Sequence, residues 1–408
     1  MDYQELFPVP TEWLQDMDLQ AASTVREWAD SEVMAQRLER REEFDTLLMP
    51  AMRKLFVDIG LQGMLLPEEY GGGGLDEPSA VMTLTALLEQ VARGDVGAGF
   101  VLANGCSAQF ALGSADPSAL EKAASLACGD EVAFFPLVLP SYAGPGAPGG
   151  PSWSGLDYQA RAVPGDGSWV LSAEAARPQC SGALASALTV AAALPGGEPG
   201  LFLVPCDLQG VEVGEPFRKT GLAASLNADV TLRDVSVPAP CLIAEGVEAF
   251  RAVLSRYYVL CSAVTCGALM ATYEIVKEWV DTRVIKGRGQ VFKENPLVAA
   301  LLGRIGERMG TSRLLAYGTA RLLGDPARYG PAGAPSLFAT AGAAFKTVTR
   351  SAMEAMDNTM ELMGSAGYAT EWNLERYWRD VKTLESTVAP ETVAFTDMAR
   401  HYFDLRKL

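Results

Sequence analysis

Residues 361–392 read ELMGSAGYATEWNLERYWRDVKTLESTVAPET and combine a helix end, a turn, a charged helix and the start of another helix. Before them, four methionines from Met353 to Met363 recur every three or four residues, which predicts one apolar helix face. Gly364 and Gly367 then end this helix, because glycine readily adopts the left-handed backbone conformation. The two glycines indicate either a simple helix cap or a place where a ligand approaches the backbone.

The composition predicts a folded, acidic protein. The chain has 408 residues, 49% of them apolar, which is enough for a large core in two or three domains. Lys and Arg total 33 against 50 Asp and Glu, so the formal net charge is −17. Because nucleic-acid-binding proteins usually display a basic face, we do not expect this chain to bind nucleic acid.

The cysteines and the histidine exclude several kinds of site. Seven cysteines form no Cys-x-x-Cys pair, so we expect reduced, mostly buried thiols and neither a disulfide framework nor a zinc ribbon. The single histidine, His401, is predicted to be a surface or packing residue, and no metal site is expected. A Ser-His-Asp triad is excluded as well, so proton abstraction requires a carboxylate, a lysine, a tyrosine or a cofactor.

The N-terminus and the hydropathy pattern predict a cytoplasmic protein that does not bind membranes. No segment has eighteen consecutive apolar residues, and the acidic start, with Asp2 and Glu5, lacks the basic region of a signal peptide.

Periodicity divides the chain into three predicted domains of an α+β fold. Residues 1–128 show helical spacing, and the charges from Arg37 to Glu43 are assigned to a solvated helix face. Residues 129–245 contain short β-type runs between proline and glycine, which predicts an antiparallel β-barrel or sandwich. Residues 246–408 return to long helices, including 296–323 and 335–363, which predicts a helical bundle.

Two glycine-rich segments match phosphate-binding patterns only superficially. Residues 65–74, LLPEEYGGGG, follow no strand and are predicted to form a mobile loop. Residues 144–149, GPGAPG, satisfy Gly-x-Gly-x-x-Gly, but their prolines prevent a helix from starting there. We therefore expect no Rossmann-type dinucleotide site.

Cations in two regions of the sequence need anionic partners. Arg283, Lys286 and Arg288 form a basic, glycine-broken segment after a long apolar helix. In so acidic a chain they indicate either a pyrophosphate site or cations that complement the helix dipole. Arg256 lies within the same apolar helix, and its partner is either an internal carboxylate or a bound ligand.

Several of these segments resemble the acyl-CoA dehydrogenase family over about residues 65–400. The motifs that carry the resemblance are Pro-Glu-x-Tyr-Gly-Gly from Pro67, Gly-x-x-x-Ser from Gly221, Gly-x-x-Gly-Tyr from Gly364, and Arg-Asp at Arg379. The resemblance implies an N-terminal helical domain, a central β domain and a C-terminal four-helix bundle. It also implies an FAD that accepts a hydride from the β-carbon of a CoA thioester while a carboxylate removes the α-proton.

The same resemblance implies specific site residues. Those implied for cofactor binding are Arg283, Gly364, Ser365, Gly367, Thr392 and Ser141. Those implied for substrate binding are Arg256 and Tyr368. In the family, the arginine corresponding to Arg283 reaches the flavin pyrophosphate of a neighbouring subunit.

The identity of the base is open at this point. An ungapped count puts Val388 at the family's glutamate position, and Glu391 reaches it only if the preceding turn is shifted. Glu391 equally suits a first-turn helix glutamate with no catalytic role. The family's alternative position holds Ser255, and Asp95 is a further candidate carboxylate.

Two functions therefore remain open. The first is an active FAD-dependent acyl-CoA dehydrogenase, and the second is a non-catalytic subunit that completes a partner's flavin site through Arg283. Departures from the family pattern favour the second, at Glu361, Ser365, Lys286, Gly289, Val388 and the Ser141 loop. Flavin chemistry on a thioester without dehydrogenation is a third possibility. Expected partners are an acyl-CoA of unspecified acyl group, an electron-transfer flavoprotein, and identical or different subunits contacting the C-terminal helices.

Overall fold

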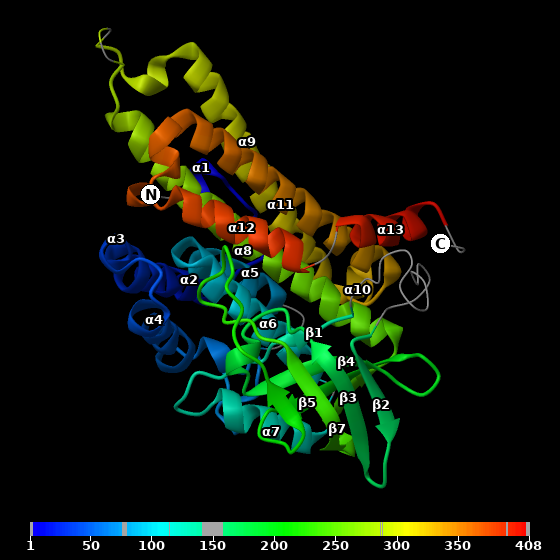
Figure 1. Ribbon diagram of the computed structural model, residues 1–408. Coiled ribbons are helices and arrows are strands. Elements are labelled where there is room, and N and C mark those ends of the chain that lie inside the picture. The colour runs from blue at the N-terminus through cyan, green and yellow to red at the C-terminus, as the bar shows by residue number, and fades with distance from the viewer. Residues whose placement is uncertain are drawn as a thin grey trace.

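A computed structural model describes residues 3–75, 80–113, 115–140, 158–285, 287, 289–388 and 391–404. Helices from the two ends of the sequence pack together, and a single β-sheet lies at one end of them (Figure 1). The predicted fold class is confirmed: N-terminal helices, a central sheet and long C-terminal helices follow one another along the chain. The exact domain boundaries stay a prediction.

The N-terminal part is mostly helical in its described residues and contains no strand among them. Its α-helices are α1 (Tyr3–Leu6), α2 (Asp16–Trp28), α3 (Ala35–Arg40), α4 (Met49–Arg53), α5 (Ala80–Gly94), α6 (Val96–Leu112) and α7 (Pro117–Ala127). Every residue of α5 is buried. A helix that is buried on all sides belongs to the interior of a larger assembly of helices.

The four-glycine run after Tyr70 forms a tight turn that packs on the residues before it. The Gly73 N–H donates to the Gly63 carbonyl at 3.0 Å, and the Gly74 N–H donates to the Leu66 carbonyl at 2.9 Å. A Cβ on Gly72 would lie 2.1 Å from the Leu66 carbonyl oxygen, so only glycine fits. The glycines therefore allow close backbone packing in the described residues up to Leu75, and the expected mobility of this loop stays a prediction.

The central part forms a mixed sheet. Its strands are β1 (Leu137–Val138), β2 (Ala160–Pro164), β3 (Ser168–Ala176), β4 (Ala187–Ala193), β5 (Pro199–Pro205), β6 (Val211–Val213), β7 (Val230–Pro238) and β8 (Leu242–Glu245). Their order is β6-β7-β3-β2-β4-β5-β8, with β1 paired to β4. Most pairs are antiparallel as predicted, but β4 pairs in parallel with β1 and β2. The sheet has its own apolar core, separate from that of the helices.

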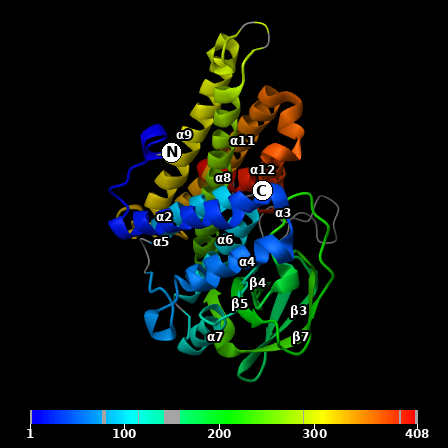
Figure 2. The ribbon, with the colours of Figure 1, turned by 90° about the vertical axis from the view of Figure 1, so that its left-hand side faces the viewer.

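The C-terminal part is built around one long helix. Its helices are α8 (Val247–Thr282), α9 (Pro296–Leu323), α10 (Pro326–Tyr329), α11 (Pro335–Met363), α12 (Leu374–Val388) and α13 (Glu391–Tyr402). Figure 2 shows α8, α9 and α11 side by side away from the sheet. Only α8, in the described residues, is long and apolar enough to cross a membrane, but 83% of its most apolar window is buried inside the protein. It is therefore the core helix of the bundle.

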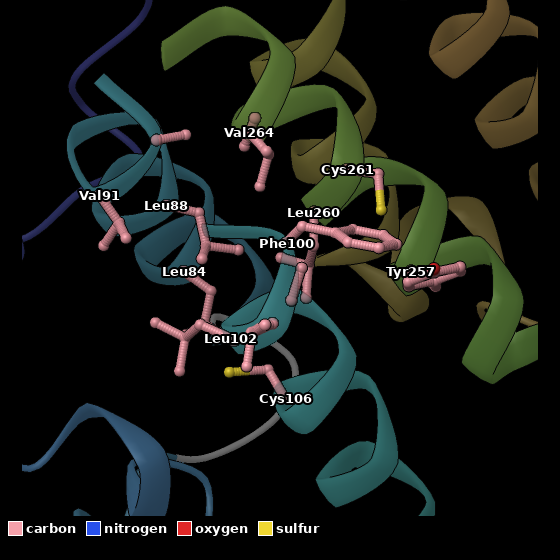
Figure 3. Packing of buried hydrophobic residues seen from close by; sticks show 14 of the residues in the cluster. Leu84, Leu88, Val91, Phe100, Leu102, Cys106, Tyr257, Leu260, Cys261 and Val264 are labelled. Atoms are coloured by element: carbon pink, nitrogen blue, oxygen red, sulfur yellow. The ribbon is translucent and has the colours of Figure 1, made fainter. Parts of the chain in front are cut away.

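The two helical parts share one core where α5 and α6 meet α8. Phe100 of α6 lies beside Tyr257 of α8, with ring centroids 6.4 Å apart (Figure 3). A Cβ on Gly267 of α8 would lie 2.2 Å from the Glu89 carbonyl oxygen of α5. Gly267 therefore permits the close crossing of α5 and α8.

Candidate cofactor and substrate sites

One candidate site lies at the C-terminal end of α8, which we call the Arg283 end. The Arg283 guanidinium lies over the indole of Trp279, 4.5 Å from the ring centroid. Trp279 meets Trp372 edge to face at 5.2 Å, and Ala366 packs against the same apolar cluster. The structure thus brings Arg283 and the Gly364–Tyr368 turn to one aromatic cluster within a single chain.

The two glycines of this turn serve different purposes. Gly364 is exposed, has a φ of +61°, and has no atom within 4 Å of the position a Cβ would take. Gly367 is buried, and a Cβ there would lie 2.8 Å from the Met360 carbonyl oxygen. Gly364 therefore leaves room for a ligand to approach, whereas Gly367 packs against its own helix. Ser365 is exposed beside Gly364.

The Arg283 end fits the phosphate-bearing part of an FAD. It combines an exposed cation with an open backbone turn, the two features that bind phosphate oxygens in proteins. The Trp279 Nε1 is buried and has no hydrogen-bond partner among the described residues. A bound group with acceptor oxygens would satisfy such a donor.

The second candidate site lies at the N-terminal end of α8, the Arg256 end. A cavity of about 490 Å³ opens there between α8 and the connection from α9 to α11. It is lined by Glu245, Glu248, Ala249, Ala252, Arg256, Leu323, Pro326, Pro331, Ala332 and Gly333. The Arg256 Nη1 donates to the Ala252 carbonyl at 3.0 Å, and the guanidinium lies over the Phe110 ring at 4.9 Å.

The two ends of α8 are too far apart to serve one ligand within one chain. Arg256 and Arg283 are 27 positions apart on a continuous helix, which corresponds to about 40 Å. Tyr368 lies in the turn at the Arg283 end and is 63% exposed. Arg256 and Tyr368, the two residues predicted to bind substrate, are therefore not brought together within a single chain.

The residues around the predicted base are placed only in part. Glu391 is the first residue of α13, a helix that packs against α11, where Arg350 lies over the Phe395 ring at 5.4 Å. The side chains of Glu391 and Thr392, and all of Ser141, lie outside the described residues. Their predicted roles stay predictions.

Neither family position for the base provides a carboxylate. Val388 is an apolar residue, 5% exposed, at the end of α12. Ser255 is fully buried in α8.

Asp95 is a structural residue, so the geometry argues against it as a base. It is 3% exposed, caps α6 by accepting from the Ala98 N–H at 2.8 Å, and accepts from Arg37 Nη2 at 2.6 Å. Burial disfavours its ionised form, but Arg37 and Arg376 outweigh burial and lower the pKa of Asp95. A carboxylate that two arginines hold ionised is a poor proton acceptor.

Arg37 is an exception within the run assigned to a solvated helix face: it is 1% exposed, whereas Glu39, Arg41 and Glu43 are exposed as predicted. Arg37 belongs to a buried cluster with Asp95, Arg376 and Asp380 that joins α3, α6 and α12. Asp380 also accepts from the Leu222 N–H at 2.6 Å, which ties α12 to the loop before β7. Burial raises the pKa of Asp380 to about 7, although Arg376 opposes the shift.

Two predicted exclusions can be compared with the described residues. None of these residues forms a group of three or more His, Cys, Asp or Glu side chains able to hold a metal ion. All seven cysteines are free, and Cys128 and Cys206 alone among them are partly exposed. Five of the seven are buried, which confirms the expectation of mostly buried thiols, and their redox state stays a prediction.

Comparisons with known proteins agree on the family. A probable acyl-CoA dehydrogenase of Bacillus subtilis is 24% identical over 88% of this chain and 91% of its own. Butyryl-CoA dehydrogenase from Megasphaera elsdenii has the same fold, with a TM-score of 0.79 and 20% identity over 96% of this chain and 99% of its own. A glutaryl-CoA dehydrogenase from Mycobacterium smegmatis in complex with FADH2 gives a TM-score of 0.78 and 20% identity over 98% and 97%.

Two family models cover more than half of the chain. The model of the acyl-CoA dehydrogenase N-terminal domain matches residues 16–116, and the model of the C-terminal domain matches residues 259–389. Together with the fold and the order of the motifs, these matches show that the chain belongs to the acyl-CoA dehydrogenase family.

Proposed function

We propose that this protein is an FAD-dependent acyl-CoA dehydrogenase that forms a double bond between the α- and β-carbons of a CoA thioester. The observation that supports this most is the joint placement of Arg283 and the Gly364–Tyr368 turn on one aromatic cluster. A cation beside an open backbone turn suits the pyrophosphate of a flavin dinucleotide. FAD, when bound, supplies the acceptor for the hydride from the β-carbon.

The chain's own residues have three tasks in this reaction. Arg256 and the cavity at its end of α8 orient the thioester. Arg283 and Ser365 bind the cofactor, with Thr392 and Ser141 as further proposed contacts. Glu391 accepts the α-proton. The two electrons of that α-carbon–hydrogen bond then form the new double bond as the hydride leaves the β-carbon. The electron acceptor that we propose for the bound cofactor is an electron-transfer flavoprotein, and the location that we propose is the cytoplasm.

The second candidate is a non-catalytic subunit of a heteromeric dehydrogenase. The buried Val388 favours it, because this apolar residue occupies the position at which the family places its catalytic glutamate. Such a subunit would keep the Arg283 end and lack the base. It would therefore contribute to a partner's flavin site without turning over an acyl-CoA itself.

Anaerobic titration of the purified protein with a panel of acyl-CoA thioesters distinguishes the two. We expect a yellow protein whose flavin absorbance bleaches with at least one thioester, and Glu391→Gln should keep the flavin and lose the bleaching. Glu354→Gln is the matched control, because that carboxylate is 48% exposed and pairs with Arg308 on the surface.

The opposite outcomes are equally clear. A colourless protein that supports turnover only with a second polypeptide would establish the partner role. Bleaching that survives in Glu391→Gln at the original rate would remove Glu391 as the base while leaving the dehydrogenase activity in place.

A further inference from the structure

Helix α11 carries a lysine in an unusual place. Lys346 is only 4% exposed, and the preceding Phe345 is completely buried and stacks on Tyr258 with ring centroids 5.9 Å apart. Lysine is almost never buried unless its ammonium has a partner. Here the Lys346 Nζ donates to the backbone carbonyl of Glu385 at 3.2 Å.

The acceptor lies in the last turn of α12. This helix ends at Val388, and the carbonyls of a final turn lack the intrahelical donors available to the others. They also form the negative end of the helix dipole, where a cation is stabilising. The Glu385 carboxylate itself pairs with Lys382 at 2.9 Å on the surface. Lys346 therefore anchors the backbone of α12 and not merely one of its side chains.

Keeping a cation at this position is costly. Burial lowers the pKa of Lys346 to about 8, Glu385 opposes the shift, and Arg350, one helical turn further along α11, adds to it. A neutral apolar residue would fill the same space without this cost. A contact that holds the end of α12 accounts for a lysine here.

The anchored end of α12 is close in sequence to the proposed base, since α12 ends at Val388 and Glu391 follows three positions later. After α12, the next described element is α13, which begins at Glu391 and packs on the same helix, α11, that carries Lys346. Upstream, Asp380 holds α12 to the β domain through Leu222. The helix leading to the proposed base is thus fixed at two points, and Lys346 is the one nearer to Glu391.

We propose that Lys346 is a positioning residue that fixes the end of α12 and thereby the start of α13, the helix that begins at the proposed base, Glu391. This inference rests on the proposed function for its catalytic consequence. Whether Lys346 anchors the end of α12 next to α13 does not depend on enzymatic activity. The two parts can therefore be tested separately.

Three substitutions at Lys346 and one control test the proposal. Lys346→Met keeps the length of the stem and removes the donor, Lys346→Gln keeps a neutral donor, and Lys346→Arg keeps the charge. Lys382→Met is the matched control, since it removes an exposed cation, 58% accessible, that contacts the same Glu385. The measurements are kcat, KM, flavin content and hydrogen–deuterium exchange of the peptide covering residues 384–395.

For Lys346→Met we expect kcat to fall about 10- to 100-fold, because a displacement of about 1 Å at a catalytic group has effects of this size. KM and flavin content should stay within about twofold, and exchange should accelerate in residues 384–395 but not in β3 and β7. Lys346→Arg should restore most of kcat, and Lys382→Met should match the original protein. If Lys346→Met does not fold, Lys346→Gln is expected to show the same pattern more weakly.

Two results would overturn the proposal. One is unchanged exchange in residues 384–395 of a folded Lys346→Met protein. The other is a kcat of Lys346→Met equal to that of Lys382→Met. If the original protein neither bleaches nor turns over, the proposed function fails, and the exchange measurement alone then decides whether Lys346 anchors the junction.

Discussion

Glu89 illustrates how this fold accommodates a buried charge. The carboxylate is 1% exposed and accepts from Arg313 Nε at 2.6 Å, from Arg313 Nη2 at 3.0 Å and from the Tyr317 hydroxyl at 2.9 Å. The pair therefore joins α5 to α9 with both carboxylate oxygens satisfied. Such pairs are tolerated as long as both members are present.

Replacing one member should be strongly destabilising. For Arg313→Met we expect a loss of about 3–5 kcal/mol in the free energy of unfolding, because Glu89 would remain buried without its cation. Combining it with Glu89→Gln should recover part of the loss. Guanidinium denaturation of the single and double variants measures both values, and equal stabilities of Arg313→Met and the original protein would contradict the expectation.

Asp380 makes stability depend on pH in a definite direction. Its pKa is raised to about 7 from an ordinary value near 3.8, so between these values the folded protein binds more protons than the unfolded one. The contribution of this carboxyl is therefore present below about pH 4 and is lost as pH rises towards 7. Asp380→Asn removes the titration and keeps an oxygen to accept from Leu222.

The check is the difference in melting temperature between the original protein and Asp380→Asn across pH 5–8. The melting temperature of the original protein should fall relative to that of the variant as pH rises to about 7, and the difference between the two should then stay constant. A difference that is constant with pH, or that changes in the opposite sense, would show that Asp380 titrates at an ordinary pKa.

The burial of these charged residues could not be predicted from the sequence. Arg37 stands in a dense run of charges, a pattern typical of a solvated helix face. Its partner Asp95 is 58 positions away, and nothing in the local pattern signals that the two meet. Lys346 is similar, since its acceptor is a backbone carbonyl 39 positions further on.

Individual helices were much easier to predict than individual contacts. The expected ranges 296–323 and 335–363 coincide with α9 and α11, because each begins at a proline and is followed by a glycine. The parallel pairing of β4 with β1 and β2 was not foreseen, because short apolar strands carry no sign of their neighbours' direction.

Substituting Gly267 tests whether this glycine permits the close crossing of α5 and α8. Gly267→Ala would place a methyl group 2.2 Å from the Glu89 carbonyl oxygen, so the helices must move apart. We expect a loss of about 1–3 kcal/mol or more in the free energy of unfolding. Gly303→Ala in α9 is the control, since no atom lies within 4 Å of its added Cβ and it should gain up to about 1 kcal/mol. Equal effects of the two substitutions would refute this account of the crossing.

For the molecule as a whole, the order of motifs predicted the family and the fold, but not how the motifs are distributed in space. Arg256 and Tyr368 were assigned to one substrate, yet the structure places them at opposite ends of α8. Their sequence motifs specify what each segment resembles. They do not specify which copy of the chain each segment serves.

This separation predicts complementation between subunits. Arg256→Ala and Arg283→Ala, at the two ends of α8, should each be inactive alone, because each removes one part of every site. Co-expressed dimers of the two should recover roughly a quarter of the sites, since half of the dimers are mixed and each has one intact site. Activity of separately purified and mixed samples serves as the baseline, and no recovery after co-expression would mean that both residues act within one chain.

The unbroken course of α8 has a consequence for how this protein can vary in length. Each residue inserted into it would lengthen the helix by about 1.5 Å and rotate one end against the other by about 100°. Both ends would then lose their orientation at once, however conservative the inserted residue. Tolerated insertions and deletions should therefore accumulate in the connections at 285–295 and 324–334, while the residue count between Val247 and Thr282 stays constant.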